Sequence, residues 1–279
     1  MTSPSRLCAT FLLSLLFCGS VFSQQSFQYT TLQVPGSSAT FATAVNNNGD
    51  IVGYSESGGE TSGFLYTNGS FQTISPCPYG GTEPTGINDA GVIVGDCNGD
   101  PFIYQNGNVS YLSYPKARYT FLMGINNQGV LVGVWENAHI FARSFVYTNG
   151  TFATVDGMRL PGGINNSDTV SGIACDNRTE VCNGALYFQK ANGWKSHRKV
   201  NFPGANGTRL GEINDNGDVV GFAGLSQDFV YNITSKTFTG FEIGNSVSSQ
   251  ALGINNSGEI VGSYSDGTTT YGFYGQLSQ

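Results

Sequence analysis

The chain has 279 residues, of which 39 are glycine, 13% are aromatic and only 11% are charged. Glycine combined with aromatic residues at these levels is typical of a protein built from short strands and tight turns. The formal net charge of −7 disfavours nucleic acid and anionic membrane surfaces as partners.

Residues 1–23 have the pattern of a secretory signal peptide. Arg6 supplies the positive charge, an apolar run follows over 7–17, and Val21 and Ser23 fit the cleavage rule, which places the cut near Ser23, before Gln24. An alternative is a lipoprotein acylated at Cys18, although Phe17 stands where that signal needs a small residue. We therefore expect 24–279 to be a single secreted domain, extracellular or periplasmic, with no later segment that resembles a membrane span.

One motif dominates the rest of the chain and recurs six times. Each copy has an aliphatic residue, then Asn, and a Gly eight positions after the aliphatic residue, as in Val45 to Gly53 and Ile87 to Gly95. The Asn residues are Asn46, Asn88, Asn126, Asn165, Asn214 and Asn255. Asn-x-x-Gly suits a turn in which the Asn side chain bonds the backbone, and Asp168 replaces the turn glycine in the fourth copy. The later Gly, inside a β-branched strand, predicts a bulge or a close backbone approach.

A second half follows each motif, with a Phe-x-Tyr type strand and, in three copies, an Asn-Gly hairpin signal at Asn68, Asn106 and Asn149. Each repeat of roughly 40 residues therefore predicts four short strands, the unit of a propeller blade. The repeats begin near residues 43, 85, 123, 162, 211 and 252. A solenoid of stacked hairpins is the alternative arrangement.

The two chain ends favour a ring. The last repeat stops at Leu277 without a fourth strand, whereas the run 27–34 before the first motif resembles the fourth strand of the other repeats. A ring needs this exchange because it removes open sheet edges, and a solenoid would need polar caps instead. We predict an all-β, six-bladed β-propeller of four-stranded antiparallel blades, closed by residues 27–34.

The repeat resembles the HAF family of bacterial extracellular repeats. Residues 124–133 match that family's Gly-Ile-Asn-x-x-Gly-x-Val-Val-Gly pattern, but Ser62 to Tyr66 replace its His-Ala-Phe-Leu-Trp-like strand. The resemblance covers essentially all of the mature chain. It implies export and a propeller-like fold, and it brings no shared catalytic residues.

Four cysteines remain after the predicted cleavage. An even number in an exported chain predicts two disulfides, and we favour Cys77–Cys97 and Cys175–Cys182 because these partners lie in the same or adjacent repeats. Four reduced core thiols are the alternative. The two histidines, His139 and His197, do not flank the cysteines at zinc-ligand spacing, so we expect no metal and no cofactor.

Variable loops indicate where a ligand could bind. The Asn-x-x-Gly and Asn-Gly turns share one face of the predicted ring, whereas the other face carries segments that differ in length and chemistry. The ligand-binding candidates there are Trp135, Tyr114, Tyr119, Arg118, Arg159 and Arg209. Aromatic platforms with arginine forks suit a carboxylated glycan or peptide. The alternative interpretation is solvated loop charges and aromatics packed between blades.

Catalytic motifs are sparse, and the sequence is compatible with three functions. The first is a monomeric, non-enzymatic binding or scaffold protein whose partner is an extracellular glycan or protein. The second is a polysaccharide hydrolase or lyase with its site at the axis, for which Glu83, Asp156 and Glu212 are available carboxylates. The third is a structural envelope or matrix protein. A His or a carboxylate pair near the axis on the variable face would favour the enzyme.

Overall fold

The computed structural model describes residues 22–137, 140–176, 181–190 and 193–278. The predicted signal peptide lies outside these residues except for Phe22 and Ser23, and so does His139. Within the described ranges the chain forms 25 strands and no helix, so the all-β prediction is confirmed. None of the described segments is a helix long and apolar enough to cross a membrane.

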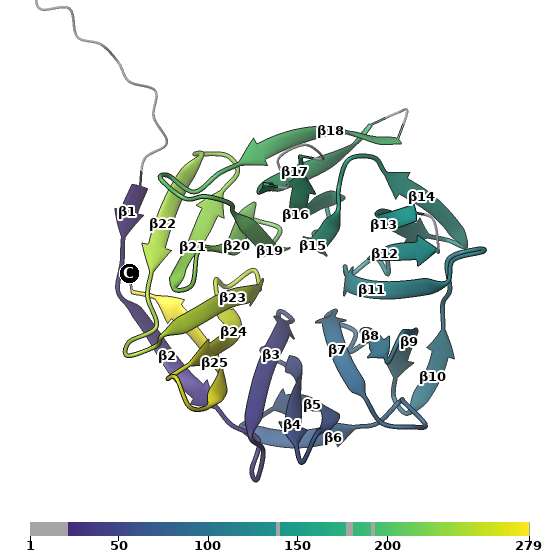
Figure 1. Ribbon diagram of the computed structural model, residues 1–279, viewed down its shortest axis with the longest axis horizontal. Helices are drawn as coiled ribbons and strands as arrows, with labels where there is room; N and C mark the ends of the chain where they lie inside the picture. The colour runs from purple at the N-terminus through teal and green to yellow at the C-terminus, as the bar shows by residue number, and fades with distance from the viewer. Residues whose placement is uncertain (1–21, 138–139, 177–180, 191–192, 279) are drawn as a thin grey trace, which may run out of the picture.

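The strands fall into six sets of four antiparallel strands, which we call units 1 to 6 and which stand around a common centre (Figure 1). Unit 1 consists of β3 (Ala39–Val45), β4 (Ile51–Ser57), β5 (Glu60–Thr67) and β6 (Ser70–Ile74). Unit 2 consists of β7 (Thr82–Ile87), β8 (Ile93–Cys97), β9 (Asp100–Gln105) and β10 (Asn108–Tyr111). Unit 3 consists of β11 (Tyr119–Ile125), β12 (Leu131–Asn137), β13 (Ile140–Thr148) and β14 (Thr151–Val155).

The remaining units follow the same order. Unit 4 consists of β15 (Leu160–Ile164), β16 (Thr169–Cys175), β17 (Cys182–Lys190) and β18 (Gly193–Val200). Unit 5 consists of β19 (Arg209–Ile213), β20 (Asp218–Ala223), β21 (Gln227–Asn232) and β22 (Thr237–Phe241). Unit 6 consists of β23 (Ser248–Ile254), β24 (Ile260–Ser265), β25 (Thr270–Leu277) and the N-terminal β2 (Phe27–Leu32). A single parallel bridge between Thr270 and Ala39 links units 6 and 1 into one eight-stranded sheet.

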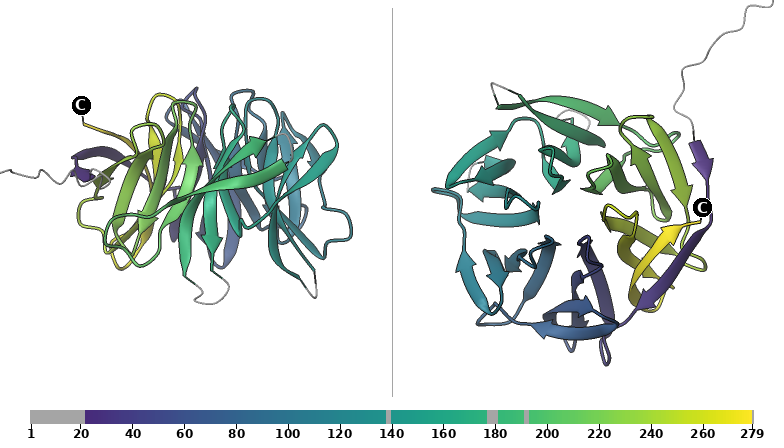
Figure 2. Two further views of the ribbon diagram at one scale, coloured as in Figure 1. Left: turned by 90° about the horizontal axis from the view of Figure 1, so that it is seen from above. Right: turned by 180° about the vertical axis from the view of Figure 1, so that it is seen from behind.

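The N-terminal strand β2 is hydrogen-bonded to the C-terminal strand β25. The antiparallel register runs from Phe27 opposite Leu277 to Leu32 opposite Gly272, and the two strands lie side by side at the rim in both views (Figure 2). Phe27 stacks on Phe241 of unit 5 at 4.5 Å, which fixes β2 against its neighbour as well. The strand ends at Leu32, slightly short of the predicted boundary at residue 34.

A further N-terminal strand extends unit 5. Strand β1 (Phe22–Gln24) pairs in parallel with β22, and the Phe22 ring meets Phe202 edge-on at 5.3 Å. Two residues of β1 precede the predicted cleavage point, so cleavage before Gln24 would leave only Gln24 of this strand.

The recurrent strand glycine has a steric cause in every unit. The first strand of each unit carries a bulge, such as the register shift between Leu122 and Gly124 in β11. A Cβ atom at Gly133 would overlap the carbonyl oxygen of Phe121, and the other five copies repeat this overlap with their own first strand. The predicted close backbone approach is therefore confirmed.

The core lies between adjacent units rather than in one central cluster. The third strands present fully buried phenylalanines at Phe102, Phe145, Phe229 and Phe273. Unit 4 has Ala185 at this position, and Tyr187 and Trp194 are buried in the cluster that surrounds it. Both predicted disulfides are present, Cys77–Cys97 and Cys175–Cys182.

Candidate functional site at the two ends of the axis

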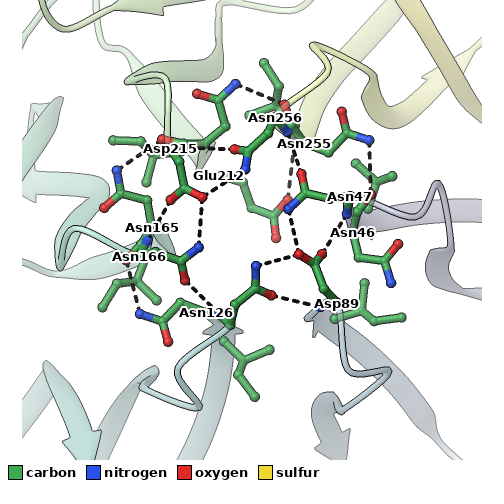
Figure 3. Close-up of a pocket in the computed structure, with 18 residues that line it drawn as sticks. Asn46, Asn47, Asp89, Asn126, Asn165, Asn166, Glu212, Asp215, Asn255 and Asn256 are labelled. Atoms are coloured by element: carbon green, nitrogen blue, oxygen red, sulfur yellow. Dashed lines mark hydrogen bonds between the residues drawn. The ribbon is translucent and has the colours of Figure 1, made fainter.

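The repeated Asn residues meet around the axis and bond to one another. In each unit the Asn Oδ1 accepts the backbone N–H four residues later; for Asn126 this is Val130 N–H at 2.9 Å. Its Nδ2 donates to the carbonyl oxygen of the equivalent Asn in the next unit, Asn165, at 3.1 Å. The series runs through all six units and ends with Asn255 Nδ2 donating to Asn46 O at 3.0 Å (Figure 3). These amides are thus structural, because each holds its own turn and the neighbouring unit.

A second ring is formed by the residues that follow these Asn residues. Its members are Asn47, Asp89, Asn127, Asn166, Asp215 and Asn256, and each backbone N–H donates to the side-chain oxygen of the next member at 2.8 to 2.9 Å. The two carboxylates lie in units 2 and 5, three units apart. Each receives amide N–H bonds from the Asn on both sides, as Asp89 Oδ2 does at 2.8 and 2.6 Å.

These bonds stabilise the charged form of Asp215. Burial alone would raise the pKa of this carboxyl, but the hydrogen bonds from Asn256 and Asn166 outweigh burial and lower it. The polar atoms of this mouth are therefore engaged mainly with one another.

A small pocket of about 60 Å³ opens at the centre of the ring, and Glu212 points into it (Figure 3). The equivalent positions in the other units are Ala44, Gly86, Gly124, Gly163 and Gly253. These residues are small because the first strands approach closely here: a Cβ on Gly86 would lie 3.0 Å from the Gly124 Cα.

Glu212 is bound across the axis. Its Oε2 accepts the Ile254 N–H of unit 6 at 3.2 Å, and the backbone N–H of Val45 in unit 1 also donates to the carboxyl group. Burial raises its pKa to about 8, more than the two backbone bonds lower it. The group is therefore mainly protonated at neutral pH. Its side chain occupies the centre of the ring, where two backbone N–H groups hold it.

The opposite face carries the linkers between units and the loops between second and third strands, and we call it the linker face. The strand register places six equivalent residues at the start of the first strands, closest to the axis: Phe41, Glu83, Phe121, Leu160, Arg209 and Gln250. Arg209 and Gln250 are exposed and the other four are half-buried. Their chemistry differs from unit to unit, unlike that of the Asn ring.

The linkers themselves are more uniform than we expected. Five of the six contain a turn closed by an N–H to C=O bond between its first and fourth residues. These turns begin at Val34, Tyr114, Val155, Phe202 and Ile243. The third residue is left-handed in each, with Lys116 at φ 63° where Gly36 or Gly204 stands elsewhere. The dipeptides Pro35-Gly36 and Pro203-Gly204 are the sequence signal for this repeated turn.

Two of the three predicted aromatic platforms, Tyr114 and Trp135, are packed rather than open. Tyr114 stacks on Trp135 at 4.6 Å with an interplanar angle of 6°, and the Tyr114 ring contacts Phe145 and Phe152 inside unit 3. Trp135 lies in β12, not in a loop, and both rings are half-buried. Their main contacts are therefore with the core of unit 3.

The predicted basic residues are exposed on the linker face. Arg118, Arg159 and Arg209 stand at the entrances to the first strands of units 3, 4 and 5. The Arg118 guanidinium lies over the Tyr119 ring at 5.1 Å, and Tyr119 is 40% exposed. Within the described part of the chain, no carboxylate pairs with these three guanidinium groups.

Unit 2 carries a pair of carboxylates, of which the sequence predicted only Glu83. Glu83 on β7 lies directly opposite Asp96 on β8, and cross-strand neighbours have Cβ atoms roughly 5 Å apart. Burial raises the pKa of Glu83, with further contributions from Asp96 and Glu56. Asp96 Oδ1 accepts the Gly99 N–H at 2.7 Å, whereas its Oδ2 is buried without a hydrogen-bond partner among the described residues. Only strand register reveals Asp96 as the partner of Glu83.

No protein-family model matches the chain, and no curated protein matches it. Several solved structures match the chain. A gluconolactonase from Xanthomonas campestris matches with a TM-score of 0.62 and 10% identity over 90% of both chains. An oligogalacturonate lyase from Vibrio parahaemolyticus matches at 0.53 and 10% over 91% of this chain and 98% of the lyase. The fold is of the propeller type. A PQQ-bound aldose sugar dehydrogenase from Streptomyces coelicolor also matches, with a TM-score of 0.50 and 12% identity over 90% of this chain and 99% of the dehydrogenase. Identities this low bear on the fold alone.

Proposed function

We propose that this chain is a secreted, monomeric, non-enzymatic binding propeller of six blades, closed by β2, which holds an extracellular glycan or protein on its linker face. Units 1 to 6 are the blades in this proposal. The pairing of β2 with β25 and the bond from Asn255 to Asn46 support the closed ring. The two disulfides indicate an oxidising environment, extracellular or periplasmic. The resemblance to HAF repeats agrees with export.

The observation that carries the binding function is a set of three exposed arginines on one face of an acidic chain, none of which pairs with a carboxylate among the described residues. Arg118, Arg159 and Arg209 follow one another around units 3, 4 and 5, and the acidic Glu56, Glu83 and Asp96 lie on units 1 and 2. A guanidinium presents a planar fork of donors that matches a carboxylate. The proposed ligand is therefore a carboxylated glycan or peptide lying along units 3 to 5, with Tyr119 beside Arg118 and the Tyr114–Trp135 stack behind them.

The test is retention of the secreted protein on immobilised polygalacturonate and alginate at low salt. The triple variant Arg118→Ala/Arg159→Ala/Arg209→Ala should lose at least tenfold in affinity. A matched pair separates the site from net charge: Arg209→Ala should weaken retention, and Lys236→Ala, with the same charge change in the β21–β22 turn at the other end of unit 5, should not. Equal retention of all variants would reject the proposal. If neither the polysaccharides nor immobilised acidic peptides retained the protein, the third function, a structural envelope or matrix protein, would be favoured.

The Glu83–Asp96 pair favours a second candidate, a polysaccharide hydrolase or lyase. A carboxyl group with a raised pKa can act as a general acid while a neighbouring carboxylate acts as base or nucleophile. The pair lies near the axis on the linker face, where an enzyme site was expected. Release of reducing ends or unsaturated products from a polysaccharide panel, abolished in both Glu83→Gln and Asp96→Asn, would establish this function. Activity that survives both substitutions would exclude this pair.

A further inference from the structure

A groove between units 6 and 1 opens on the linker face, across the axis from Arg118 and Arg159. We call it the 6–1 groove and define it by Phe41, Tyr54, Gln250, Ser263, Ser265 and Thr270. Its volume is about 240 Å³.

The two walls of the groove differ in chemistry. On unit 1, Phe41 and Tyr54 stack at 4.7 Å with an interplanar angle of 22°, and both are half-buried, so part of each ring faces the groove. Unit 6 contributes mainly serine and threonine hydroxyls and the exposed amide of Gln250, together with the side chains of Leu252 and Tyr264. An apolar aromatic wall opposite a hydroxyl and amide wall suits a ligand with one apolar face and a polar edge.

The charge around the groove selects among such ligands. None of the described residues that line it carries a formal charge. Burial raises the pKa of Tyr54 to about 12, with smaller contributions from Glu83 and Glu56, which lie beyond the aromatic wall. Tyr54 therefore remains a neutral hydroxyl, and an anionic ligand would meet the carboxylates of Glu56 and Glu83 beside the aromatic wall.

From these observations we infer that the 6–1 groove binds a neutral sugar ring, with the ring face against Phe41 and Tyr54 and its hydroxyls toward Gln250 and the unit 6 side chains. The inference rests on the proposed binding function, since both place the ligand on the linker face, but it uses different residues and an uncharged ligand. Sugar rings have an apolar C–H face and a hydroxyl edge, which is the pattern of the two walls.

The test titrates the secreted protein with neutral hexasaccharides (cello-, malto- and mannohexaose) by calorimetry. At least one should bind saturably, and Phe41→Ala and Gln250→Ala should each weaken it at least tenfold. Gln250 is exposed, so that variant reports on the groove even if Phe41→Ala folds poorly. Phe121→Ala is the matched control, because Phe121 occupies the equivalent position in unit 3 outside the groove, and it should bind normally.

The outcomes separate this inference from the proposed function. If no neutral hexasaccharide binds, or if Phe121→Ala weakens binding as much as Phe41→Ala, the groove assignment is overturned. If the arginine triple variant no longer binds polygalacturonate and no neutral hexasaccharide binds the wild type, the proposed function stands without the groove. If neutral binding is lost in Gln250→Ala but kept in the triple variant, the groove assignment is supported independently of the arginines.

Discussion

Replacing Glu212 by Gln should stabilise the protein at neutral and alkaline pH. The pKa of Glu212 rises from 4.5 to about 8 in the folded chain, and each pKa unit corresponds to about 1.4 kcal/mol. The folded pKa is raised, so the stabilising contribution of the protonated group is complete below pH 4.5 and is lost as the pH rises to 8. The loss amounts to about 3 kcal/mol at pH 7 and about 5 kcal/mol above pH 8.

The amide introduced by Glu212→Gln would remain neutral throughout and can still accept the Ile254 N–H through its oxygen, so this variant should escape the loss. The assay is urea unfolding at several pH values between 4.5 and 8.5 with both disulfides intact. The gap in unfolding free energy between variant and wild type should widen with pH. The exposed Glu242→Gln serves as control and should show no such gap. A gap below about 1 kcal/mol at pH 8.5 would show that the carboxyl is ionised and solvated, and would refute the account of the axis.

Substitutions at two further positions address the inter-unit contacts. Asp228 is fully buried, and burial raises its pKa to about 6 although Oδ1 accepts the Ala251 N–H at 2.8 Å. Asp228→Asn should remove a loss of about 3 kcal/mol that develops from about pH 4 and is complete above pH 6, and an unchanged pH profile of thermal melting would contradict this. Asn126→Ala removes partners from three hydrogen bonds and should cost about 2 to 4 kcal/mol. Asn126→Asp keeps the acceptors of the turn but loses the Nδ2 donor to Asn165 O, so it should also destabilise the protein in denaturant titration, and a cost near zero would argue against the inter-unit bond.

Sequence periodicity predicted the repeating parts of the fold because their causes are local. The left-handed fourth turn residue appears in every copy, and Asp168 adopts φ 55° where the others have glycine. Asn68, Asn106 and Asn149 are likewise left-handed at the hairpins. The exchange of a strand between the ends was also readable, because one end lacked what the other carried.

The site could be predicted only in part, because it depends on contacts between repeats. The sequence explained each Asn as a turn residue but gave no sign that its Nδ2 reaches the next unit, 38 to 49 positions away along most of the ring. Tyr114 and Trp135 read as loop aromatics, although they stack within unit 3. The Glu83–Asp96 pair and the 6–1 groove depend on strand register and inter-unit spacing.

The most direct test of the account is a cross-link between the chain ends, because the closed ring determines which residues share the linker face. Gln28 and Gln276 lie opposite each other in β2 and β25, and both are exposed. The variant Gln28→Cys/Gln276→Cys should form an additional disulfide under mild oxidation, read by mass spectrometry after proteolysis. The control Gln28→Cys/Gln105→Cys, with Gln105 in unit 2, should not. Failure of the first pair to form its disulfide, or equal yields from both pairs, would contradict the closed ring.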